Sequence, residues 1–316
     1  MDTMATKYGV IKGISSYELY PDGGIKECML NEANEIETPW GKLIPQYQDG
    51  NIRRKYINSL KFYPSGSLRS IALHQQTSFK TPIGSFPAEL VTFFENEQIK
   101  RIFPLNGKIS GHWSEEDEFK LAREFDFEFS FGKFKKKVIA VYFYESGSVK
   151  GLTFWPGDSV CIHTPIGEAE ARIGITLYQS GKLKSFEPNT PVAASTPIGE
   201  IIAYNPDAIG IHGDMNSLVF YEDGKLKALL SSHNLVTITD QNGEKEAVSP
   251  RLRRSQLDDS KIDIVPLAII FNDNTVGLGN SFIKQYNTDD CTFTVHQIPQ
   301  LYKPESNDCS SCDKCG

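Results

Sequence analysis

One ten-residue unit recurs along most of the chain and restricts its fold more than any other feature. The unit runs apolar, x, apolar, aromatic, x, x, Gly, x, apolar, Lys or Arg. Its five clearest copies are YELYPDGGIK, LKFYPSGSLR, VYFYESGSVK, ITLYQSGKLK and LVFYEDGKLK, which begin at Tyr17, Leu60, Val141, Ile175 and Leu218. Two degenerate copies, VTFFENEQIK and AIIFNDNTVG, begin at Val91 and Ala268. Such self-similarity means that one small supersecondary unit is used several times.

Each copy predicts a β-hairpin. Apolar residues such as Leu60 and Phe62 alternate, which places them on one face of a strand. The next four residues, for example Tyr63 to Gly66, fit a type I turn whose glycine takes a positive φ, giving a three-residue hairpin loop with a bulge. Asn274 stands at the glycine position of the last copy, and Asn tolerates that conformation. Glu97 fits the same position poorly, so we expect its turn to differ.

A second turn motif follows each aromatic turn after 18 to 20 residues. Thr-Pro-x-Gly segments begin at Thr38, Thr81, Thr164 and Thr196, and Asp-Gln-Asn-Gly begins at Asp240. Pro presets φ and Gly closes the turn, so a second hairpin turn is expected. Single hairpins cannot bury their apolar faces alone and must stack or curl. We therefore predict an all-β fold of antiparallel β-hairpin repeats, as a curved meander, an open β-solenoid or a partial barrel.

The units resemble MORN-type hairpin repeats, in particular the variant with an aromatic-x-x-Gly-x-apolar-Lys core found in bacterial proteins. The resemblance covers roughly residues 13 to 277. The Gly-x-Gly usual in a MORN unit is absent, and the Thr-Pro-Ile-Gly turn is additional. MORN-like repeats are mainly scaffolds and interaction surfaces, and some are linked to membranes. The resemblance therefore implies binding, with a protein as partner, and transfers no catalytic residue.

The segment from Trp113 to Phe125 departs from the repeat. Ser114 and Asp117 form a capping box with an acidic first turn, which predicts one short helix over residues 115–124. Residues 125–134 then alternate aromatic and polar side chains, as a strand with one buried face does. The next three residues, Lys135 to Lys137, are expected to form a solvated turn.

Four regions follow from these patterns. Residues 1–240 are the hairpin-repeat domain, 241–263 a polar loop or linker, 264–298 a terminal repeat or cap strands, and 299–316 a cysteine-containing tail.

Composition narrows the function classes. The 316-residue chain has a formal net charge of −7, which argues against a nucleic-acid partner. No run approaches the ~18 apolar residues of a spanning helix, and the N-terminus lacks the apolar stretch of a secretory signal, so a cytoplasmic location is expected. In that reducing compartment the six cysteines are not expected to form disulfides. Cys28 and Cys161 lie in apolar strand patterns and are expected in the core.

The remaining chemistry lies in the C-terminal tail, where Cys309, Cys312 and Cys315 form two overlapping C-x-x-C pairs. Thiolates at this spacing bind zinc, copper(I) or an iron–sulfur cluster. The three match the first three ligands of a bacterial ferredoxin-type run, so Cys291, His296 or a second chain would have to supply the fourth. The alternatives are an exposed tail without metal and a regulatory thiol switch.

Other polar features have two interpretations each. Lys26, Arg69, Lys150, Lys184 and Lys227 share one repeat position. They form either a basic ladder for an anionic partner or solubilising charges at strand edges, which we favour. His212 and Asp214 form either an acid–base or metal pair or a turn whose side chains bond locally, which we also favour. The basic run from Arg251 to Arg254 is interpreted as a solvated loop.

No P-loop, dinucleotide-binding, nucleophile-elbow or kinase motif is present. The sequence therefore predicts a non-enzymatic repeat scaffold or binding protein. A metal-binding or redox protein that uses the cysteine tail is the alternative, and an enzyme built on His212 and Asp214 is the third hypothesis.

Overall fold

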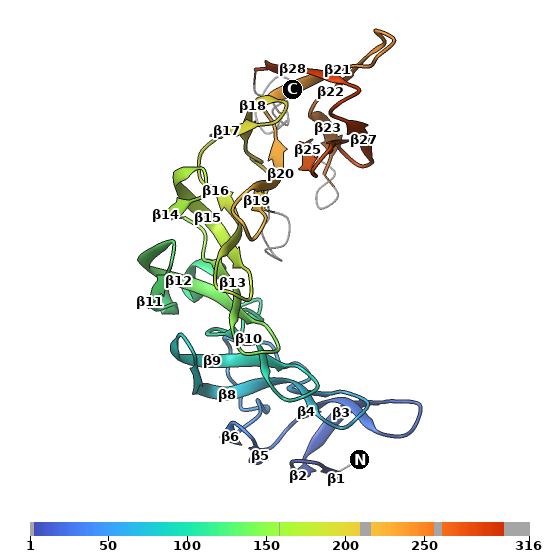
Figure 1. The fold of residues 1–316 in the computed structure, drawn as a ribbon. Helices are drawn as coiled ribbons and strands as arrows, with labels where there is room; N and C mark the ends of the chain where they lie inside the picture. Colours follow the sequence, from blue (N-terminus) through green and yellow to red (C-terminus); the bar gives the residue numbers. More distant parts are fainter. Residues whose placement is uncertain (1–2, 158, 209–215, 256–260, 300–316) are drawn as a thin grey trace, which may run out of the picture. The chain divides into compact units, whose positions relative to one another are not determined.

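The computed structural model describes residues 3–157, 159–208, 216–255 and 261–299 (Figure 1). Antiparallel strands dominate this part of the chain, and its single helix is α1 (Glu115–Leu121). The chain divides into two compact units: Met1–Val160 with Thr176–Lys182, and Cys161–Ile175 with Leu183–Gly316. The prediction of an all-β meander of antiparallel hairpins is confirmed. No helix among the described residues has the length and apolar character that a membrane span requires.

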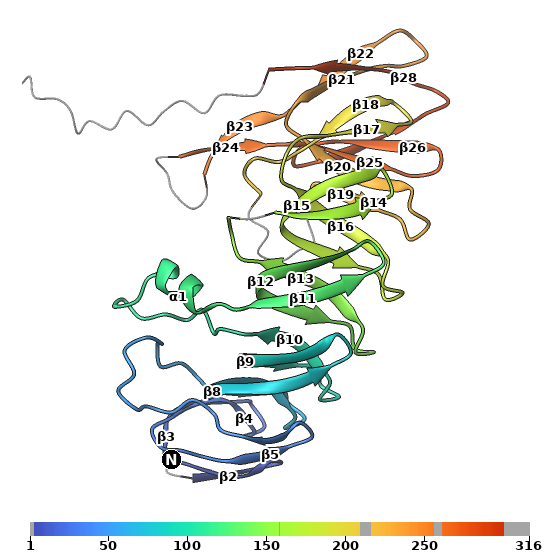
Figure 2. The same cartoon turned by 90° about the vertical axis from the view of Figure 1, so that its left-hand side faces the viewer.

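The first unit is built on a meander of neighbouring antiparallel strands (Figure 2). In spatial order they are β3 (Ile14–Leu19), β4 (Ile25–Leu30), β7 (Leu60–Phe62), β8 (Leu68–Thr81), β9 (Gly84–Phe93), β10 (Ile99–Phe103), β12 (Gly132–Phe143) and β13 (Val149–Phe154). Shorter hairpins accompany them: β1 (Thr3–Thr6) with β2 (Gly9–Lys12), β5 (Ile36–Thr38) with β6 (Gly41–Leu43), and β11 (Glu124–Phe129) with the first half of β12.

The second unit repeats the design. Its meander contains β16 (Leu183–Pro188), β19 (Leu218–Phe220), β20 (Leu226–Ser231), β25 (Leu267–Phe271), β26 (Thr275–Gly279) and β27 (Ile283–Asn287). Its other pairings are β17 (Val192–Thr196) with β18 (Gly199–Ala203), β21 (Asn234–Thr239) with β22 (Lys245–Val248) and β28 (Thr292–Gln297), and β23 (Arg251–Arg254) with β24 (Ile262–Val265). Strands β14 (Val160–Thr164) and β15 (Gly167–Leu177) contribute residues to both units.

The aromatic turns have the predicted geometry. In the copy at Tyr63, the tyrosine N–H donates to the Ser67 carbonyl at 2.8 Å and the Gly66 N–H donates to the Tyr63 carbonyl at 2.9 Å. Gly66 has a φ of 79°, which a side chain would disfavour. Phe94 and Glu97 make the same two bonds, and Glu97 takes a φ of 66°. The prediction that the Glu97 turn differs is therefore wrong.

Contacts from two other turns hold Glu97 in this strained conformation. Its carboxylate accepts hydrogen bonds from Lys7 Nζ at 2.9 Å and from the Tyr8 hydroxyl. The indole of Trp40 donates to its carbonyl oxygen at 2.9 Å. A left-handed non-glycine residue costs about 1–3 kcal/mol and persists only where its surroundings over-determine it. Three donors from the β1–β2 and β5–β6 turns meet that condition.

The last copy departs from the pattern at Asn274. This residue does not take a positive φ, so the prediction of a left-handed Asn274 is wrong. The turn is shorter instead, because the Asn272 N–H donates to the Thr275 carbonyl at 2.9 Å and the Asn272 amide contacts the Thr275 hydroxyl at 3.3 Å.

The turn tyrosines also join one repeat to the next, a role that the sequence analysis did not give them. In four copies the hydroxyl donates to the carbonyl of the residue that precedes the next repeat's turn. The bonds are Tyr20 to Phe62 at 2.8 Å, Tyr63 to Phe93 at 2.9 Å, Tyr144 to Leu177 at 2.8 Å and Tyr221 to Phe271 at 2.9 Å. The aromatic position therefore fixes the spacing of successive hairpins.

The Thr-Pro turns are closed by their threonines. The hydroxyl donates to the glycine carbonyl three residues on, at 2.8, 2.7, 2.7 and 2.6 Å for Thr38, Thr81, Thr164 and Thr196. Thr6 makes the same bond to Gly9 at 2.8 Å, in a copy that the sequence analysis missed because it lacks proline. The segment at Asp240 has the bonds of the aromatic turns instead, with the Gly243 N–H donating to the Asp240 carbonyl at 3.0 Å.

Several local predictions need correction. The helix has the predicted capping box but ends at Leu121 rather than at residue 124. The aromatic run is a hairpin rather than one strand, because Gly132 takes a φ of 153° and β12 begins there, so Lys135 to Lys137 lie in a strand. The two arms pack their aromatic rings together, with Phe127 and Phe134 centroids 5.6 Å apart. The expected loop at 241–263 contains β22, β23 and the start of β24, so Arg251 to Arg254 form an exposed strand.

Candidate anion-binding groove

The basic residue of the repeat stands on a β-bulge in the five copies at Lys26, Arg69, Lys100, Lys150 and Lys227. In the β9–β10 pair, Ile99 faces Phe93 and Arg101 faces Thr92, so Lys100 is the extra residue between them. A bulge sets two residues against one and re-aims their side chains. Five strands, β4, β8, β13, β16 and β20, carry the shared cations Lys26, Arg69, Lys150, Lys184 and Lys227, and each of these strands is paired on both sides. The interpretation of these cations as guards of strand edges is therefore wrong.

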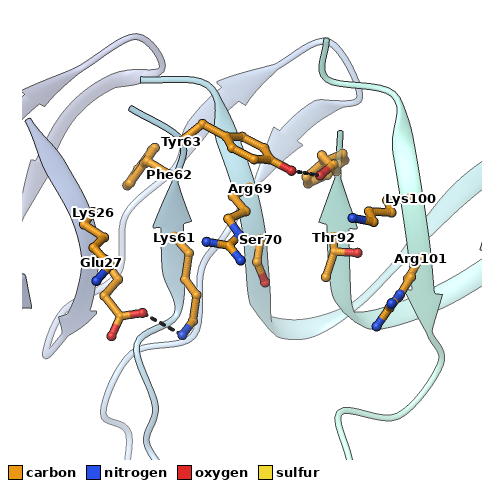
Figure 3. Close-up of a pocket in the computed structure, with 11 residues that line it drawn as sticks. Lys26, Glu27, Lys61, Phe62, Tyr63, Arg69, Ser70, Thr92, Lys100 and Arg101 are labelled. Carbon is orange, nitrogen blue, oxygen red and sulfur yellow. Dashed lines mark hydrogen bonds and ion pairs between the residues drawn. The ribbon is translucent and has the colours of Figure 1, made fainter. Parts of the chain in front are cut away.

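In the first unit these bulges produce a groove on the outer face of the sheet (Figure 3). It crosses five neighbouring strands, β4 to β10, and has a volume of about 360 Å³. Its polar lining consists of Lys26, Glu27, Lys61, Tyr63, Arg69, Ser70, Thr92, Lys100 and Arg101. The aromatic side chains of Phe62 and Phe93 are buried beneath it, so the groove floor is fixed by the core of the unit.

One row of directly paired residues forms the axis of the groove. Glu27 faces Lys61, Lys61 faces Ser70, Ser70 faces Thr92, and Thr92 faces Arg101. Side chains directly opposite on antiparallel strands have Cβ atoms about 4.5–5.5 Å apart. The row therefore brings residues from 27 to 101 into one continuous surface.

Two of the five lining cations are neutralised by carboxylates. Lys61 Nζ lies 2.6 Å from Glu27 Oε2, and Lys26 Nζ lies 2.6 Å from Glu18 Oε1. The hydrogen bond from Lys61 is the largest influence on Glu27 and holds the pKa of its carboxyl below the ordinary value. Both carboxylates lie at the β3–β4 end of the groove, so this end carries no net charge.

The other three cations, Arg69, Lys100 and Arg101, form no ion pair with any carboxylate of the described residues. Each lies over an aromatic ring instead. The distances to the ring centroids are 5.8 Å for Arg69 over Tyr63, 5.3 Å for Lys100 over Phe94 and 5.1 Å for Arg101 over Tyr142. A ring attracts and orients a cation without cancelling its charge. Since two of the five lining cations are paired with carboxylates, three positive charges remain, on Arg69, Lys100 and Arg101. We call these three residues the cation triad.

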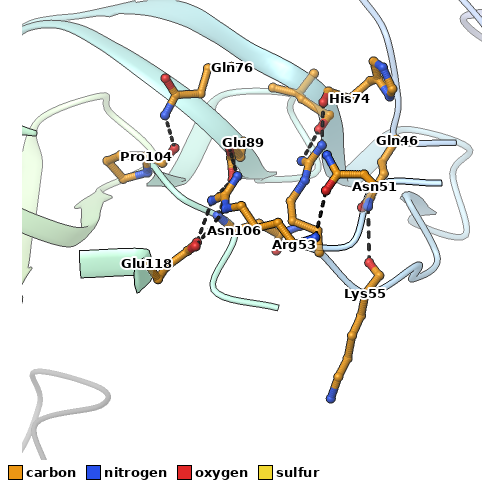
Figure 4. Close-up of polar contacts among 12 residues, drawn as sticks. Gln46, Asn51, Arg53, Lys55, His74, Gln76, Glu89, Pro104, Asn106 and Glu118 are labelled. Atoms are coloured by element: carbon orange, nitrogen blue, oxygen red, sulfur yellow. Dashed lines mark hydrogen bonds and ion pairs between the residues drawn. The ribbon is translucent and has the colours of Figure 1, made fainter. Parts of the chain in front are cut away.

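A second polar cluster of the first unit is structural (Figure 4). Arg53 contacts Glu89 at 2.7 Å and Glu118 at 2.6 Å, and both carboxylates are buried. The Asn106 N–H donates to Glu89 at 3.0 Å. Because one guanidinium holds both carboxylates, neither is free to act as a general acid or base. The cluster ties α1 to β9, and the charges that form it are too far apart in the sequence to reveal it.

The residues predicted for metal binding are only partly described. Cys309, Cys312 and Cys315 lie outside the described residues, as do His212 and Asp214. Cys291 precedes β28 and His296 lies on it, and the described part of the chain contains no group of three or more His, Cys, Asp or Glu side chains that could hold a metal ion.

The two cysteines expected in the core have different environments. Cys28 is buried, and burial raises the pKa of its thiol to about 12, so it is inert. Cys161 is exposed, so its prediction as a core residue is wrong. It lies on β14, whose buried residues are its neighbours Val160 and Ile162.

Comparison with known proteins finds no matching family model, no matching curated protein and no matching solved structure. The resemblance to MORN-type repeats stays a prediction from the sequence motifs. The cation triad and its groove are therefore the basis for inferring a function.

Proposed function

We propose that this chain is a non-enzymatic repeat scaffold that binds an acidic segment of a partner protein in the groove of its first unit. The observation that carries this proposal is the cation triad. Arg69, Lys100 and Arg101 lie close together on one face, and aromatic rings orient them without neutralising them.

The charge balance of the chain supports a bound anion. The whole protein carries a formal charge of −7, yet this groove holds three uncompensated positive charges. Like charges held close together repel one another, and an anionic ligand would offset that repulsion. A concave surface of one sign also raises the local concentration and association rate of oppositely charged ligands.

The groove lining supports binding rather than catalysis. Its described titratable groups are lysines, arginines, one tyrosine and the ion-paired Glu27, and it contains no histidine or cysteine. General acid–base catalysis needs a group that exchanges protons near the working pH. Lysine and arginine remain charged there, which suits them to holding an anion.

The test measures binding of a fluorescent dodecapeptide rich in Asp and Glu at low and moderate ionic strength. We expect the triple variant R69Q/K100Q/R101Q to bind at least about tenfold more weakly than the wild type. Raising the salt concentration should weaken wild-type binding more steeply than binding by the variant.

Lys227→Gln is the matched control, because Lys227 occupies the same repeat position over Tyr221 at 5.2 Å and is followed by Ala228 rather than by a second cation. This variant should bind the peptide as the wild type does. The proposal would be refuted if the wild-type protein does not bind the peptide at low salt. It would also be refuted if the triple variant remains folded and binds the peptide as tightly as the wild type does.

A further inference from the structure

We infer that the cation triad recognises a single phosphate monoester, presented as a phosphoserine or phosphothreonine on the acidic partner segment. This inference rests on the proposed function and names the group that the groove selects. It follows from the number of charges, the hydroxyl groups between them and the carboxylates at one end of the groove.

The triad surrounds one point on the sheet. Thr92, on β9, lies between Arg69 and Ser70 on one side and Lys100 and Arg101 on the other (Figure 3). Strands β8 and β10 are two strand spacings apart, or about 10 Å. The long cationic side chains therefore flank the space above Thr92 from both sides.

The centre of this space contains an unused hydroxyl. Thr92 Oγ1 is buried and has no hydrogen-bond partner among the described residues. A buried polar atom without a partner is destabilising unless a ligand or water satisfies it. Thr92 as a whole is only half-buried, so rotation about its Cα–Cβ bond would turn this hydroxyl toward the groove, where an oxygen of a bound anion would accept its hydrogen bond.

The donors outnumber what a carboxylate can use. A carboxylate has one negative charge and two oxygens, whereas a phosphate monoester has a charge of about −1.5 to −2 and three terminal oxygens. The site offers two guanidiniums, one ammonium and the hydroxyls of Ser70 and Thr92. Guanidinium forks bind phosphate and carboxylate oxygens alike in a bidentate manner, so the selectivity comes from the higher charge and the third terminal oxygen of a phosphate, which can use the donors that a carboxylate leaves unpaired.

The surroundings favour one phosphate on a peptide over a nucleic acid or a membrane. The ion-paired Glu18 and Glu27 lie about 14–19 Å from Thr92 along the row of paired strands, so this end of the groove has no net positive charge to hold further phosphates of a nucleic-acid backbone. The apolar lining residues Phe62 and Phe93 are buried, so the groove offers no apolar side chain for insertion into a bilayer.

The experiment compares one acidic dodecapeptide in three forms, with phosphoserine, glutamate or serine at its centre. We expect the phosphoserine form to bind wild-type protein at least about tenfold more tightly than the glutamate form. Thr92→Val should weaken binding of the phosphoserine form several-fold without loss of fold, because Thr92 Oγ1 has no protein partner to lose among the described residues.

Arg101→Lys keeps the charge but removes the planar fork. It should weaken binding of both forms, and of the phosphoserine form more, because phosphate offers the fork three terminal oxygens and a carboxylate only two, so the preference for phosphoserine should fall. Lys227→Gln should change neither affinity.

The outcomes separate this inference from the proposed function. Equal affinity for the phosphoserine and glutamate forms overturns phosphate recognition but leaves the acidic-segment scaffold in place. Binding of neither form overturns both proposals. Tighter binding to poly(U) RNA, or to phosphatidylcholine vesicles containing phosphatidylserine, than to the phosphopeptide overturns the assignment of a peptide as ligand.

Discussion

Replacing Glu187 with glutamine should make the second unit more stable at alkaline pH and leave it unchanged at acidic pH. Glu187 lies on β16 with 1% of its surface exposed. Its carboxylate accepts hydrogen bonds from the Ser217 N–H at 2.8 Å and hydroxyl at 2.9 Å. The nearest cation is Arg172, whose Nη2 is 3.6 Å away and already donates to the Asn205 carbonyl at 2.7 Å.

Burial raises the pKa of the Glu187 carboxyl, whereas the contacts with Ser217 and Arg172 lower it. Burial is the larger effect, and the pKa rises from 4.5 to about 7. A carboxyl whose folded pKa is raised contributes full stability below its unfolded pKa, and this stability is lost as the pH rises through the folded pKa. A difference of about 2.5 pH units corresponds to about 3 kcal/mol. Glutamine stays neutral at every pH and keeps an oxygen that can accept from Ser217. Glu187→Gln should therefore match the wild type near about pH 4 and exceed its stability by about 3 kcal/mol near about pH 8.

Amide hydrogen exchange of β16 and β19 is the suitable assay, because it reports the local free energy of opening in the second unit. Tryptophan fluorescence would not report on this unit, since Trp40, Trp113 and Trp155 all belong to the first. Glu200→Gln, at an exposed position of β18, is the control and should give no pH-dependent difference. If the Glu187 variant were less stable than the wild type by the same amount at both pH values, the carboxylate would be ionised and held by Arg172, and the reasoning would be wrong.

Three further predictions concern the turns and the tail. Tyr63→Phe removes the hydroxyl that donates to the Phe93 carbonyl at 2.9 Å, and it should lower the free energy of urea unfolding by about 1 kcal/mol. An unchanged midpoint of urea unfolding would show that this hydrogen bond does not couple the repeats. Glu97→Gly relieves the strain of the positive φ of 66° but loses the carboxylate that binds Lys7 and Tyr8. We expect faster hydrogen exchange of the β1–β2 amides. Slower exchange would mean that the strain at Glu97 outweighs these contacts. If the tail cysteines Cys309, Cys312 and Cys315 hold a metal, anaerobically purified protein contains zinc or an iron–sulfur cluster that is lost when they are replaced by serine. Metal-free protein with three freely titrating thiols would refute a metal site in the tail.

The sequence predicts those features of the fold that depend on neighbouring residues alone, such as the turns. Glycine spacing located the aromatic turns because a positive φ is cheapest for glycine, and Gly66 at 79° is an example. Glu97 shows the limit of this rule. It adopts the same conformation because Tyr8 and Trp40 bind it across 89 and 57 positions of sequence. Turn propensity carries no information about such distant partners, so the exception could not be found without the fold.

Register explains why the groove was only half predicted. The shared basic position, which includes Lys26 and Arg69, was evident from the repeat, but Lys61, Thr92 and Arg101 belong to the site only because the strand pairing aligns them. The bulges set that alignment, and a shift of one residue would move each side chain to the other face of the sheet. Spacing within one repeat cannot fix the register between neighbouring repeats.

The bulge also explains how nearly identical repeats come to differ in surface charge. Every copy with a described bulge exposes one cation, and the residue after that cation joins it on the same face. That next residue is Glu27, Ser70, Arg101, Gly151 or Ala228 in the successive copies. Glu27 neutralises Lys61 on the neighbouring strand, and Gly151 and Ala228 add neither a charge nor a side-chain donor. Ser70 and Arg101, which lie on either side of β9, add a hydroxyl donor and a positive charge. The charge that each stretch of sheet presents beside its repeat cation is therefore set by this one position, while the turn and core positions remain free to keep the hairpins alike.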